Sequence, residues 1–322
     1  MASAGTVIVT HNSAAVIGEC LKALDGLRAI VVDNASCDDT VACVTGYPNV
    51  TVIANPENRG FAAAVNQGFA HLDRELILIL NPDAVLLSDL EPLAEACRRS
   101  GLAAGRLVDA GGCTQTGFTI RRFPTPWTLV FEALGLNRLW PANPVNRRYR
   151  YLDRNQEEPG PVDQPAGAFL MVWRDVWEQC GGFDEEFFPV WFEDVDFCRR
   201  ANQAGFVAEY VPAVMARHLG GHSVSRIPSP CRTLYWYVSL LKYASKHFQR
   251  VPSKGVAVAV LLGAVPRAMT GIILERSLNP LGVYWQVARL GWRHLFAGRA
   301  QQCSGVENAD NKPRLSPLIG GK

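Results

Sequence analysis

The sequence predicts an α/β fold with a Rossmann-like, mostly parallel sheet, followed by a C-terminal helical region. Two observations predict the sheet: short β-branched runs alternate with helix-like stretches through the first eighty residues, and these runs are mostly apolar rather than alternately polar and apolar. Strands that are apolar on both faces belong to parallel sheets covered by helices on both sides, and their connections are right-handed crossovers. A third observation, helical periodicity after Arg232, predicts the helical region.

Strand and helix signals alternate in order along the first part of the chain. The strand-like runs are 6–10, 29–33, 50–54 and 75–80, and the helix-like stretches are 14–24, 39–45 and 61–72. Between 105 and 165 the periodicity fades into Gly, Pro and Arg, which predicts loops, one short helix and part of an acceptor-binding loop. Regularity returns with a strand over 167–173, a helix over 193–204 that ends at Gly205, and a strand over 206–211.

Charge divides the chain more clearly than its net value of +2 suggests. Residues 232–299 carry ten Lys and Arg against one acid, Glu275, whereas the remainder carries 22 basic and 29 acidic residues. We therefore expect a main domain over 1–231 and a basic, aromatic-rich helical region over 232–299. The last stretch, 300–322, is rich in Gly, Asn, Gln and Ser and is expected to be a disordered tail.

The basic region combines Lys and Arg with many Tyr and Trp, which suits an anionic membrane surface or a polyanionic partner. The alternative is that its aromatic side chains are buried in a helical bundle or in a homodimer interface. Nucleic acid is disfavoured because no nucleic-acid-binding motif accompanies the charge. The longest apolar run, 256–265, stops at Pro266 and is shorter than the roughly 20 residues of a spanning helix, so the sequence predicts no integral span.

Cysteine usage and the N-terminal segment both favour the cytoplasm. The nine cysteines are odd in number, scattered and without a CxxC pair, which disfavours a disulfide framework or a zinc site. The first residues lack the basic and then apolar pattern of a secretory signal. The protein is expected to be cytoplasmic, with peripheral attachment to the inner face of the cell membrane.

Polar residues follow each of the first four predicted strands. Because the carboxyl ends of parallel strands meet at one edge of a sheet, these residues are expected to form a common ligand-binding rim. The dinucleotide pattern GxGxxG and the phosphate loop GxxxxGK[ST] are both absent, so neither of those nucleotide sites is supported. The rim segments are Thr10-His11-Asn12, Asp33-Asn34-Ala35-Ser36, Asn55 to Gly60, and Asn81-Pro82-Asp83.

Each rim residue taken alone also fits a helix cap or a turn. Together they fit a nucleoside diphosphate, whose charge a divalent cation on Asp83 would neutralise in place of a glycine loop. Asp33 can accept a hydrogen bond from a pyrimidine N–H, and Arg59 can reach the base or a phosphate.

A second acidic cluster, Glu193, Asp194 and Asp196, follows four aromatic residues. These acids could simply favour the N-terminus of the helix that follows and pair with Arg199 and Arg200. The aromatic surroundings would raise a carboxylate pKa, whereas the helix terminus would lower it. A carboxylate here could act as general base towards a sugar hydroxyl.

The third candidate segment runs from Arg217 to Arg226 and contains His218 and His222 in a Gly-rich context. A lone histidine is more often a structural residue than a ligand. Two histidines four residues apart after a predicted strand favour a functional role, in which His218 completes the shell of a metal ion and Arg226 contacts a diphosphate. The zinc-protease motif HExxH is absent.

Taken in order, these segments resemble glycosyltransferase family 2, the inverting enzymes with a GT-A fold, and within it the rhamnosyltransferase-like branch. The resemblance rests on VIVTHNS, VVDNASCDDT, NPENRGFAAAVNQG, LILNPDA, the stretch GAFLMVWRDVWEQCGGFDEEFFPVWFEDVDFCRRANQAG, and HLGGHSVSR. It implies that the nucleotide sugar is bound by Thr10, Asn12, Asp33, Asn34, Ser36, Arg59, Gly60, Asn66, Asp83 and Arg226.

The resemblance also implies the catalytic and metal residues. Asp83 stands where the last acid of the DXD motif binds a metal ion, and Asp194, next to Glu193, stands where the ED motif supplies the base. Because Asn81-Pro82-Asp83 keeps one acid where the fuller motif has two or three, the resemblance gives His218 more weight as a ligand of Mg²⁺ or Mn²⁺.

The resemblance therefore implies an inverting glycosyltransferase with a dTDP- or UDP-linked donor and rhamnose as the leading sugar. The expected acceptor is a hydroxyl of a glycan or a polyprenyl-diphosphate-linked sugar in cell-envelope polysaccharide synthesis. Two alternatives remain open: a sugar-nucleotide nucleotidyltransferase, which would need an N-terminal Gly-rich loop that this chain lacks, and a non-catalytic nucleotide-sugar-binding protein, which would not need Glu193 and Asp194.

Overall fold

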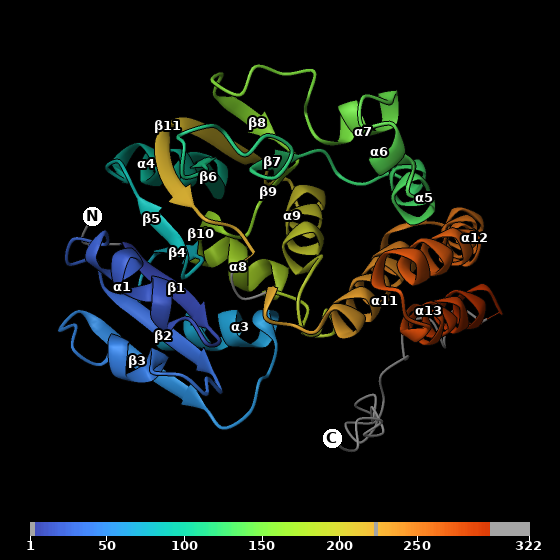
Figure 1. Cartoon of the computed structure of the whole chain (residues 1–322). Helices are drawn as coiled ribbons and strands as arrows, with labels where there is room; N and C mark the ends of the chain where they lie inside the picture. Colours follow the sequence, from blue (N-terminus) through green and yellow to red (C-terminus); the bar gives the residue numbers. More distant parts are fainter. Residues whose placement is uncertain (1–3, 222–224, 297–322) are drawn as a thin grey trace.

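The computed structural model describes residues 4–221 and 225–296 (Figure 1). A nine-stranded sheet has the order β3-β2-β1-β4-β10-β6-β11-β5, with β8 paired to β11. Helices cover both faces of this sheet, and a separate group of helices lies at the C-terminal end of the described chain (Figure 1). The predicted α/β class with a C-terminal helical region is confirmed.

The first four strands form the parallel part of the sheet. β1 pairs with both β2 and β4, and β2 pairs with β3, all in parallel. Every residue of β1, β2 and β4 is buried, as expected of strands covered on both faces. The bounds are β1 Ala4–Thr10, α1 Ala14–Lys22, β2 Ala29–Asn34, α2 Thr40–Val44, β3 Val50–Asn55, α3 Phe61–His71 and β4 Leu76–Leu80, close to the predicted ranges.

The other half of the sheet mixes directions. β10 runs antiparallel to both β4 and β6, and β11 runs parallel to β6 but antiparallel to β5 and β8. Phe169, the first residue of β10, lies opposite Leu80, the last residue of β4, so the chain enters β10 at the edge where β4 ends. The bounds are β5 Ala84–Leu86, α4 Glu91–Ser100, β6 Leu102–Val108, β8 Gly160–Val162, β10 Phe169–Trp173, α8 Arg174–Cys180, α9 Glu193–Gln203 and β11 Ala208–His218.

The segment between 105 and 165 is more regular than the sequence predicts. β6 occupies its start, and three short helices follow where one was expected. Thr125 and Asn143 cap two of them, each with a proline in the first turn, so local capping rather than hydrophobic periodicity defines these helices. The bounds are β7 Ile120–Arg121, α5 Pro126–Leu134, α6 Leu136–Leu139, α7 Pro144–Tyr149 and β9 Gln164–Pro165, which pairs with β7.

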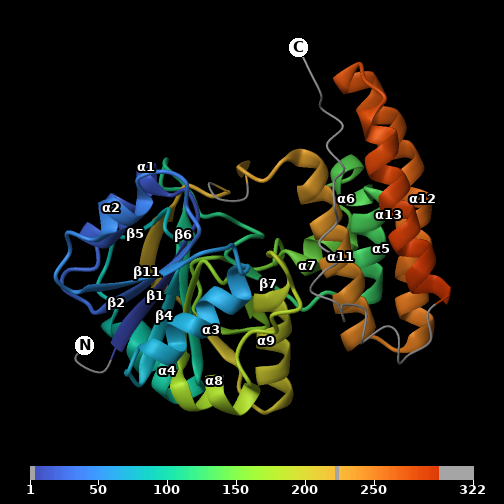
Figure 2. The same ribbon diagram turned by 90° about the horizontal axis from the view of Figure 1, so that it is seen from below.

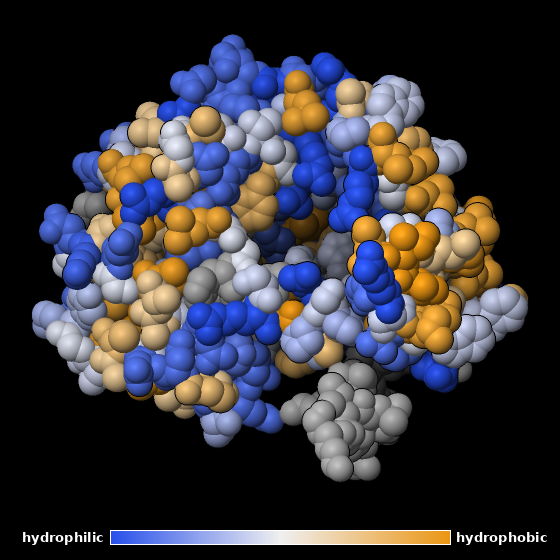
Figure 3. Space-filling view, viewed as in Figure 1, coloured by the Kyte–Doolittle hydropathy of each residue, from blue (hydrophilic) through white to orange (hydrophobic). Residues whose placement is uncertain are grey.

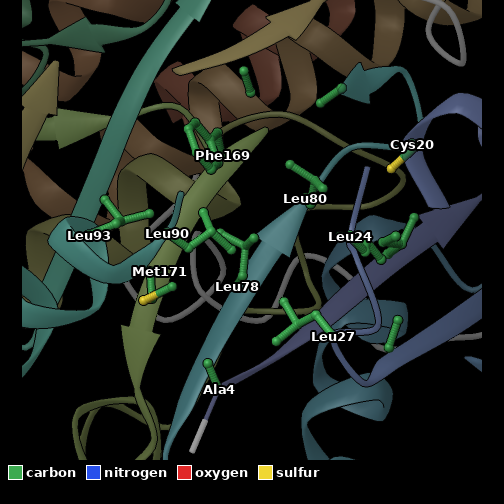
Figure 4. Close-up of a cluster of buried hydrophobic side chains, with 14 of the residues drawn as sticks. Ala4, Cys20, Leu24, Leu27, Leu78, Leu80, Leu90, Leu93, Phe169 and Met171 are labelled. Atoms are coloured by element: carbon green, nitrogen blue, oxygen red, sulfur yellow. The ribbon is translucent and has the colours of Figure 1, made fainter. Parts of the chain in front are cut away.

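Alternating residues of the central strands build two cores. Leu78 and Leu80 of β4 belong to the core under α1 and α4, together with Phe169 and Met171 of β10 (Figure 4). The intervening Ile79 belongs to the core on the opposite face, under α3, α8 and α9. The sheet is therefore held from both sides, which fixes the strand ends that carry the polar rim.

The C-terminal helices form a third core with α5. α11 (Ser229–His247), α12 (Arg250–Glu275) and α13 (Asn279–Phe296) confirm the predicted helical region, while the predicted tail over 300–322 lies outside the described residues. Asp196 of α9 joins this group to the sheet half, because its carboxylate lies 2.9 Å from Lys246 Nζ and 2.7 Å from His247 Nε2.

One expectation about this region is wrong. Pro266 does not end the apolar helix, since α12 continues through it for a total of 26 residues. Proline removes the hydrogen bond to the carbonyl four residues earlier, but surrounding packing often keeps such a helix intact. α12 is therefore long and apolar enough to cross a membrane, and about two-fifths of its most apolar window is buried inside the protein.

Candidate active site

The ends of β1 and β2 form a tight polar network around Asp33. The buried Asp33 carboxylate accepts hydrogen bonds from Thr10 Oγ1 at 2.8 Å, from the Ser36 backbone N–H at 2.9 Å and from Ser36 Oγ at 2.5 Å. Ser36 Oγ in turn accepts from the Asn12 N–H at 2.7 Å. The sequence-predicted residues Thr10, Asn12, Asp33 and Ser36 therefore lie together at one edge of the sheet.

The next part of the rim is built on Asn34 and Gly60. Asn34 Nδ2 donates to the Gly60 carbonyl at 3.0 Å, and Asn34 Oδ1 accepts from Asn55 Nδ2 at 3.1 Å. Gly60 has φ +84°, and a Cβ on it would lie 2.8 Å from the Phe188 ring. Glycine is thus required here both by the left-handed backbone and by the close approach of Phe188. Arg59 is exposed directly before this turn.

Asn66 connects α3 to the segment that leads to α9. Its Oδ1 accepts from the Phe183 N–H at 3.0 Å, and its Nδ2 donates to the Phe183 carbonyl and to Glu185 Oε1, each at 2.9 Å. These contacts give Asn66 a role in positioning the chain before Glu193. Contact with a nucleotide stays a prediction for this residue.

Asp83 and His218 meet at the ends of β4 and β11. Both side chains are buried, and His218 Nε2 lies 3.4 Å from Asp83 Oδ1 and 3.3 Å from Asn81 Nδ2. Gln115 fixes the ring from the other side, because its Oε1 lies 2.9 Å from His218 Nδ1 and its Nε2 donates to the His218 carbonyl at 2.7 Å. An amide oxygen only accepts, so Nδ1 donates to Gln115 and Nε2 is the ring nitrogen that faces Asp83.

This pair fits a divalent cation that shares its coordination with a substrate. Two adjacent ligands of one ion with bonds of about 2.1 Å lie roughly 3 Å apart, close to the observed separation of 3.4 Å. Among residues 4–221 and 225–296, no group of three or more His, Cys, Asp and Glu is arranged around one ion. Mg²⁺ commonly takes only one or two protein ligands and completes its shell with phosphate oxygens and water.

Asp194 occupies the N-terminus of α9, held by two backbone donors. The Gly167 N–H donates to Asp194 Oδ2 at 2.9 Å, and the Val195 N–H donates to Oδ1 at 2.7 Å. Trp191 and Phe192, directly before α9, have φ of +83° and +72°. Bulky residues rarely adopt this conformation, and such strain concentrates at functional sites.

The two candidate acids of α9 differ in their electrostatic surroundings. Burial raises the pKa of Asp194, while the Gly167 N–H and the Arg121 charge act against that rise. Burial and then the Asp194 charge raise the pKa of Glu193 well above its ordinary value, and within the described residues Glu193 Oε2 has no hydrogen-bond partner. Asp194 is therefore the better candidate for a carboxylate base, and Glu193 favours its neutral form.

Asp83 and Asp194 lie at the same edge of the sheet. The Asn81 N–H donates to the Ala168 carbonyl at 3.0 Å, and the neighbouring Gly167 N–H donates to Asp194. The two-residue segment Gly167–Ala168 thus connects the region of the Asp83–His218 pair to the candidate base, Asp194. The surface is hollowed on this side of the molecule, between the sheet half and the C-terminal helices (Figure 3).

Arg226 lies at the β1–β2 side of the rim. Burial acts to raise the pKa of Asp38, but hydrogen bonds from Thr40 and the nearby Arg226 charge hold it below its ordinary value. Asp38 precedes α2, directly after the Asp33 network. The chain after β11 therefore brings an exposed arginine back to the predicted nucleotide-binding residues.

Residues 6–180, more than half of the chain, match the family model described as glycosyl transferase family 2. The chain belongs to glycosyl transferase family 2. This match confirms the family that the sequence motifs indicate, and the protein is a glycosyltransferase.

Several bacterial relatives are rhamnosyltransferases. The chain is 29% identical over 237 residues to the N-acetylglucosaminyl-diphospho-decaprenol L-rhamnosyltransferase of Mycobacterium tuberculosis, covering 69% of this chain and 76% of the relative. It is 28% identical over 171 residues to the rhamnosyltransferase WbbL of Escherichia coli K12, covering 51% of this chain and 60% of the relative.

Solved structures of other glycosyltransferases share the fold. Staphylococcus aureus TarS 1-349 in complex with UDP-GlcNAc aligns with a TM-score of 0.54 at 14% identity, covering 91% of this chain and 81% of TarS. The mannosyltransferase PcManGT from Pyrobaculum calidifontis, in complex with GDP-Man and Mn²⁺, aligns with a TM-score of 0.50 at 16% identity, covering 95% and 88%. At these identities the similarity shows the fold alone, and the predicted GT-A fold is confirmed.

Three residues that support the site of this glycosyltransferase were not found from the sequence: Gln115, Arg121 and Gly167. Gln115 contacts His218 across 103 positions, and Gly167 contacts Asp194 across 27. No local pattern marks a residue whose partner is so distant in the chain. The conspicuous neighbours of Gly167 in the sequence are apolar, and they indicate a strand rather than a hydrogen bond to a base.

Proposed function

We propose that this protein is an inverting glycosyltransferase that moves a rhamnose-like sugar from a dTDP- or UDP-linked donor to a sugar hydroxyl on a polyprenyl-diphosphate-linked acceptor in cell-envelope polysaccharide synthesis. The observation that carries the proposal is the joint placement of Asp194 and the Asp83–His218 pair at one sheet edge, one Gly167–Ala168 segment apart. The lipid-linked acceptor and the sugar are supported by the name of the Mycobacterium tuberculosis relative.

The donor would lie across the ends of the parallel strands. The Asp33 network with Thr10, Asn12 and Ser36 offers a fixed polar surface to the base and ribose. Asn34 and Gly60 shape the neighbouring turn, and the exposed Arg59 and Arg226 can approach the diphosphate. Asp83 and His218 would hold Mg²⁺ or Mn²⁺. A bound divalent ion would accept charge from the departing diphosphate.

The transfer balances with groups of this chain and of the two substrates. The acceptor oxygen forms a bond to C1 of the sugar from the face opposite the leaving group, and its proton passes to the Asp194 carboxylate. The bond between C1 and the phosphate oxygen breaks, and its electron pair leaves with the nucleoside diphosphate. Gly167 and Val195 keep the carboxylate of Asp194 oriented during this step.

The central test is Asp194→Asn, which keeps the shape of the side chain and removes the base. We expect transfer to fall by about 10²–10⁴-fold with unchanged donor affinity, because general base catalysis typically contributes that factor. The measurement is release of nucleoside diphosphate, with donor affinity by calorimetry. Glu193→Gln is the matched control and should keep most activity, because Glu193 already favours its neutral form.

Near-normal transfer by Asp194→Asn would place the base elsewhere. Chelation with EDTA should abolish transfer, and full activity after chelation would exclude a required ion.

We place the reaction at the cytoplasmic face of the cell membrane, where lipid-linked acceptors and nucleotide sugars meet. A homodimer through the C-terminal helices is the alternative to membrane attachment.

A further inference from the structure

The outward face of α12 is a continuous apolar stripe. Its members recur at helical spacing, so they lie on one side of the helix over most of its length. Leu262, Met269 and Ile273 are each at least 60% exposed. No charged residue interrupts the stripe, which consists of Val251, Val258, Leu262, Val265, Met269 and Ile273.

α13 extends this surface and adds basic side chains. α12 and α13 pack side by side as the outer layer of the helical group (Figure 2). Trp285 and Trp292 of α13 are 67% and 59% exposed, and Arg289 and Arg293 are exposed between and beside them. Figure 3, in which both helices are seen nearly end-on, shows apolar surface where they come to the front. Exposed apolar surface of this extent marks an interaction site rather than ordinary solvent-facing surface.

The opposite face of α12 is anchored inside the protein. A Cβ on Gly263 would lie 2.0 Å from the Ala133 carbonyl oxygen, so α12 and α5 are in backbone contact. Arg267 donates to the Ala133 and Glu132 carbonyls, where the end of α5 leaves backbone acceptors open. Val256, Val260 and Ala264 are buried in the third core. α12 could cross a bilayer only by giving up this packing.

We propose that the α12–α13 face docks on an anionic lipid bilayer, with both helices parallel to its surface and the apolar stripe at the boundary between headgroups and acyl chains. An apolar face flanked by Arg and Lys, with Trp between them, is the pattern of helices that lie in this interface. The proposal deepens the proposed function, since it names the surface from which a lipid-linked acceptor would reach the site.

Charge selects the membrane over a second copy of the chain. Residues 232–299 carry ten basic residues and one acid, and Lys246 and Lys242 already pair with acids of the sheet half. A second copy would add its own Arg289 and Arg293 to this face, and the one acid that α12 and α13 offer them is Glu275. An anionic bilayer offers the complementary charge, worth about fivefold in binding per Lys or Arg near the surface.

The first experiment measures binding of the full chain to vesicles of phosphatidylcholine and phosphatidylglycerol in a two-to-one ratio, by co-sedimentation. Leu262→Gln/Met269→Gln should lower partitioning by about tenfold or more, because two exposed apolar side chains no longer enter the acyl boundary. Arg289→Gln/Arg293→Gln should lower binding to these vesicles by about 25-fold and leave binding to pure phosphatidylcholine unchanged.

The matched control is Leu87→Gln/Val207→Gln, which replaces two exposed apolar residues of the sheet half, 49% and 41% exposed. This control should bind vesicles like the parent protein. A second measurement uses the parent protein alone: quenching of tryptophan fluorescence by brominated lipids should be strong, and should weaken in Trp285→Phe/Trp292→Phe.

Three outcomes would overturn the proposal. One is equal vesicle binding by the parent protein and by the stripe variant, Leu262→Gln/Met269→Gln. Another is a parent dimer that the stripe variant dissociates, with no vesicle binding by either. The third is that protein bound to one set of vesicles does not transfer to protein-free vesicles added later, which would indicate a helix that spans the bilayer. Release of nucleoside diphosphate with a water-soluble acceptor tests the proposed function separately, because the stripe variant should retain it.

Discussion

Buried carboxyl groups have different surroundings at the strand-end rim and at the junction with the C-terminal helical region. The first turn of α9 contains both kinds. Asp194 contacts Gly167 at the rim and Glu193 directly precedes it, and burial raises the pKa of both carboxyl groups. Asp196, on the same helix, is fully buried yet lies within 3.0 Å of Arg200, Lys246 and His247. The carboxyl groups at the rim therefore incur an electrostatic cost that suits proton transfer, whereas Asp196 stabilises the junction with α11.

The apolar side chains of the two regions show the reverse contrast. The strands of the sheet half bury theirs on both faces, whereas α12 and α13 expose Leu262, Met269 and Trp285. The sheet half buries its strands between helices and carries a polar site at one edge. The helical region is complete only on its inner side, which is why its outer face is assigned to a surface outside the chain.

The largest effect on stability is expected where Asp196 joins the two regions. Asp196→Asn leaves Arg200, Lys246 and His247 without their shared acid and should lower the free energy of unfolding by about 3 kcal/mol at neutral pH. Urea unfolding measures this loss. Arg98→Gln is the control, since its pairing with Glu91 is exposed and should change stability by less than about 1 kcal/mol.

The pH dependence of this effect has a definite sign. Burial acts to raise the pKa of Asp196, but the His247 hydrogen bond and the Arg200 and Lys246 charges together hold it below its ordinary value. The unfolded state therefore binds the proton first as pH falls, so the stabilisation is present above about pH 4 and is lost as pH falls through the lowered pKa. In Asp196→Asn this acid-side loss should disappear, and an unchanged acid profile would contradict the ion-pair account.

The next effect concerns Asp83 and His218, the candidate metal ligands at the rim. Gln115→Leu removes the acceptor that fixes the His218 ring and should weaken Mn²⁺ affinity by about 10–100-fold, as the loss of supporting hydrogen bonds does at metal sites. Calorimetry with Mn²⁺ and a nucleoside diphosphate gives the affinity. Gln156→Leu, in the loop that contacts Tyr151, is the control and should leave it unchanged. Equal affinities for parent and Gln115→Leu would show that His218 is not a ligand.

A smaller effect separates close approach from backbone strain at the rim. Gly60→Ala meets Phe188 at 2.8 Å, whereas Gly26→Ala has the similar φ of +79° and nothing within 4 Å. Both should cost about 1 kcal/mol from the left-handed backbone. Gly60→Ala should also shift the segment before α9 and weaken donor binding severalfold. Thermal unfolding and donor calorimetry measure the two quantities, and identical behaviour of the variants would remove the argument for Phe188.

The smallest effect is expected at Glu193. Because burial and the Asp194 charge raise its pKa, the folded state holds this proton to higher pH than the unfolded state does. Stability is therefore lost as pH rises from the unfolded pKa of about 4.3 towards the raised value. Glu193→Gln should remove that loss and increase stability at neutral pH. A clear decrease in stability would mean that Glu193 is ionised and paired in the folded state.

Much of the sheet could be predicted from the sequence because its strands are local signals. The runs 30–32 and 76–80 contain apolar residues alone, which is the local pattern of strands that are buried on both faces. The antiparallel entry of β10 could not be predicted, since pairing of Phe169 with Leu80 depends on contacts across the whole sheet. The short helices between 126 and 149 were missed because capping by Thr125 and Asn143 defines them over too few residues for a periodic pattern.

The same distinction between local signals and long-range contacts applies to the candidate site. Thr10 and Asp33 end predicted strands and Ser36 follows one, so the shared edge of the sheet brings them together as expected. Asn66 illustrates the limit: the motif marks the residue, but its hydrogen bonds to Phe183 and Glu185 depend on a segment more than a hundred positions away. α12 continues through Pro266, which shows that a helix can tolerate an internal proline when it packs against a neighbouring helix, here α5.

The most direct test of the shared site is anomalous diffraction from crystals grown with Mn²⁺ and a nucleoside diphosphate. The predicted result is a single strong peak roughly 2 Å from the Asp83 carboxylate and His218 Nε2, bridged to the diphosphate, with the Asp194 carboxylate open to the same hollow. A peak remote from Asp83, or an Asp194 side chain that faces away from the bound diphosphate, would contradict the account.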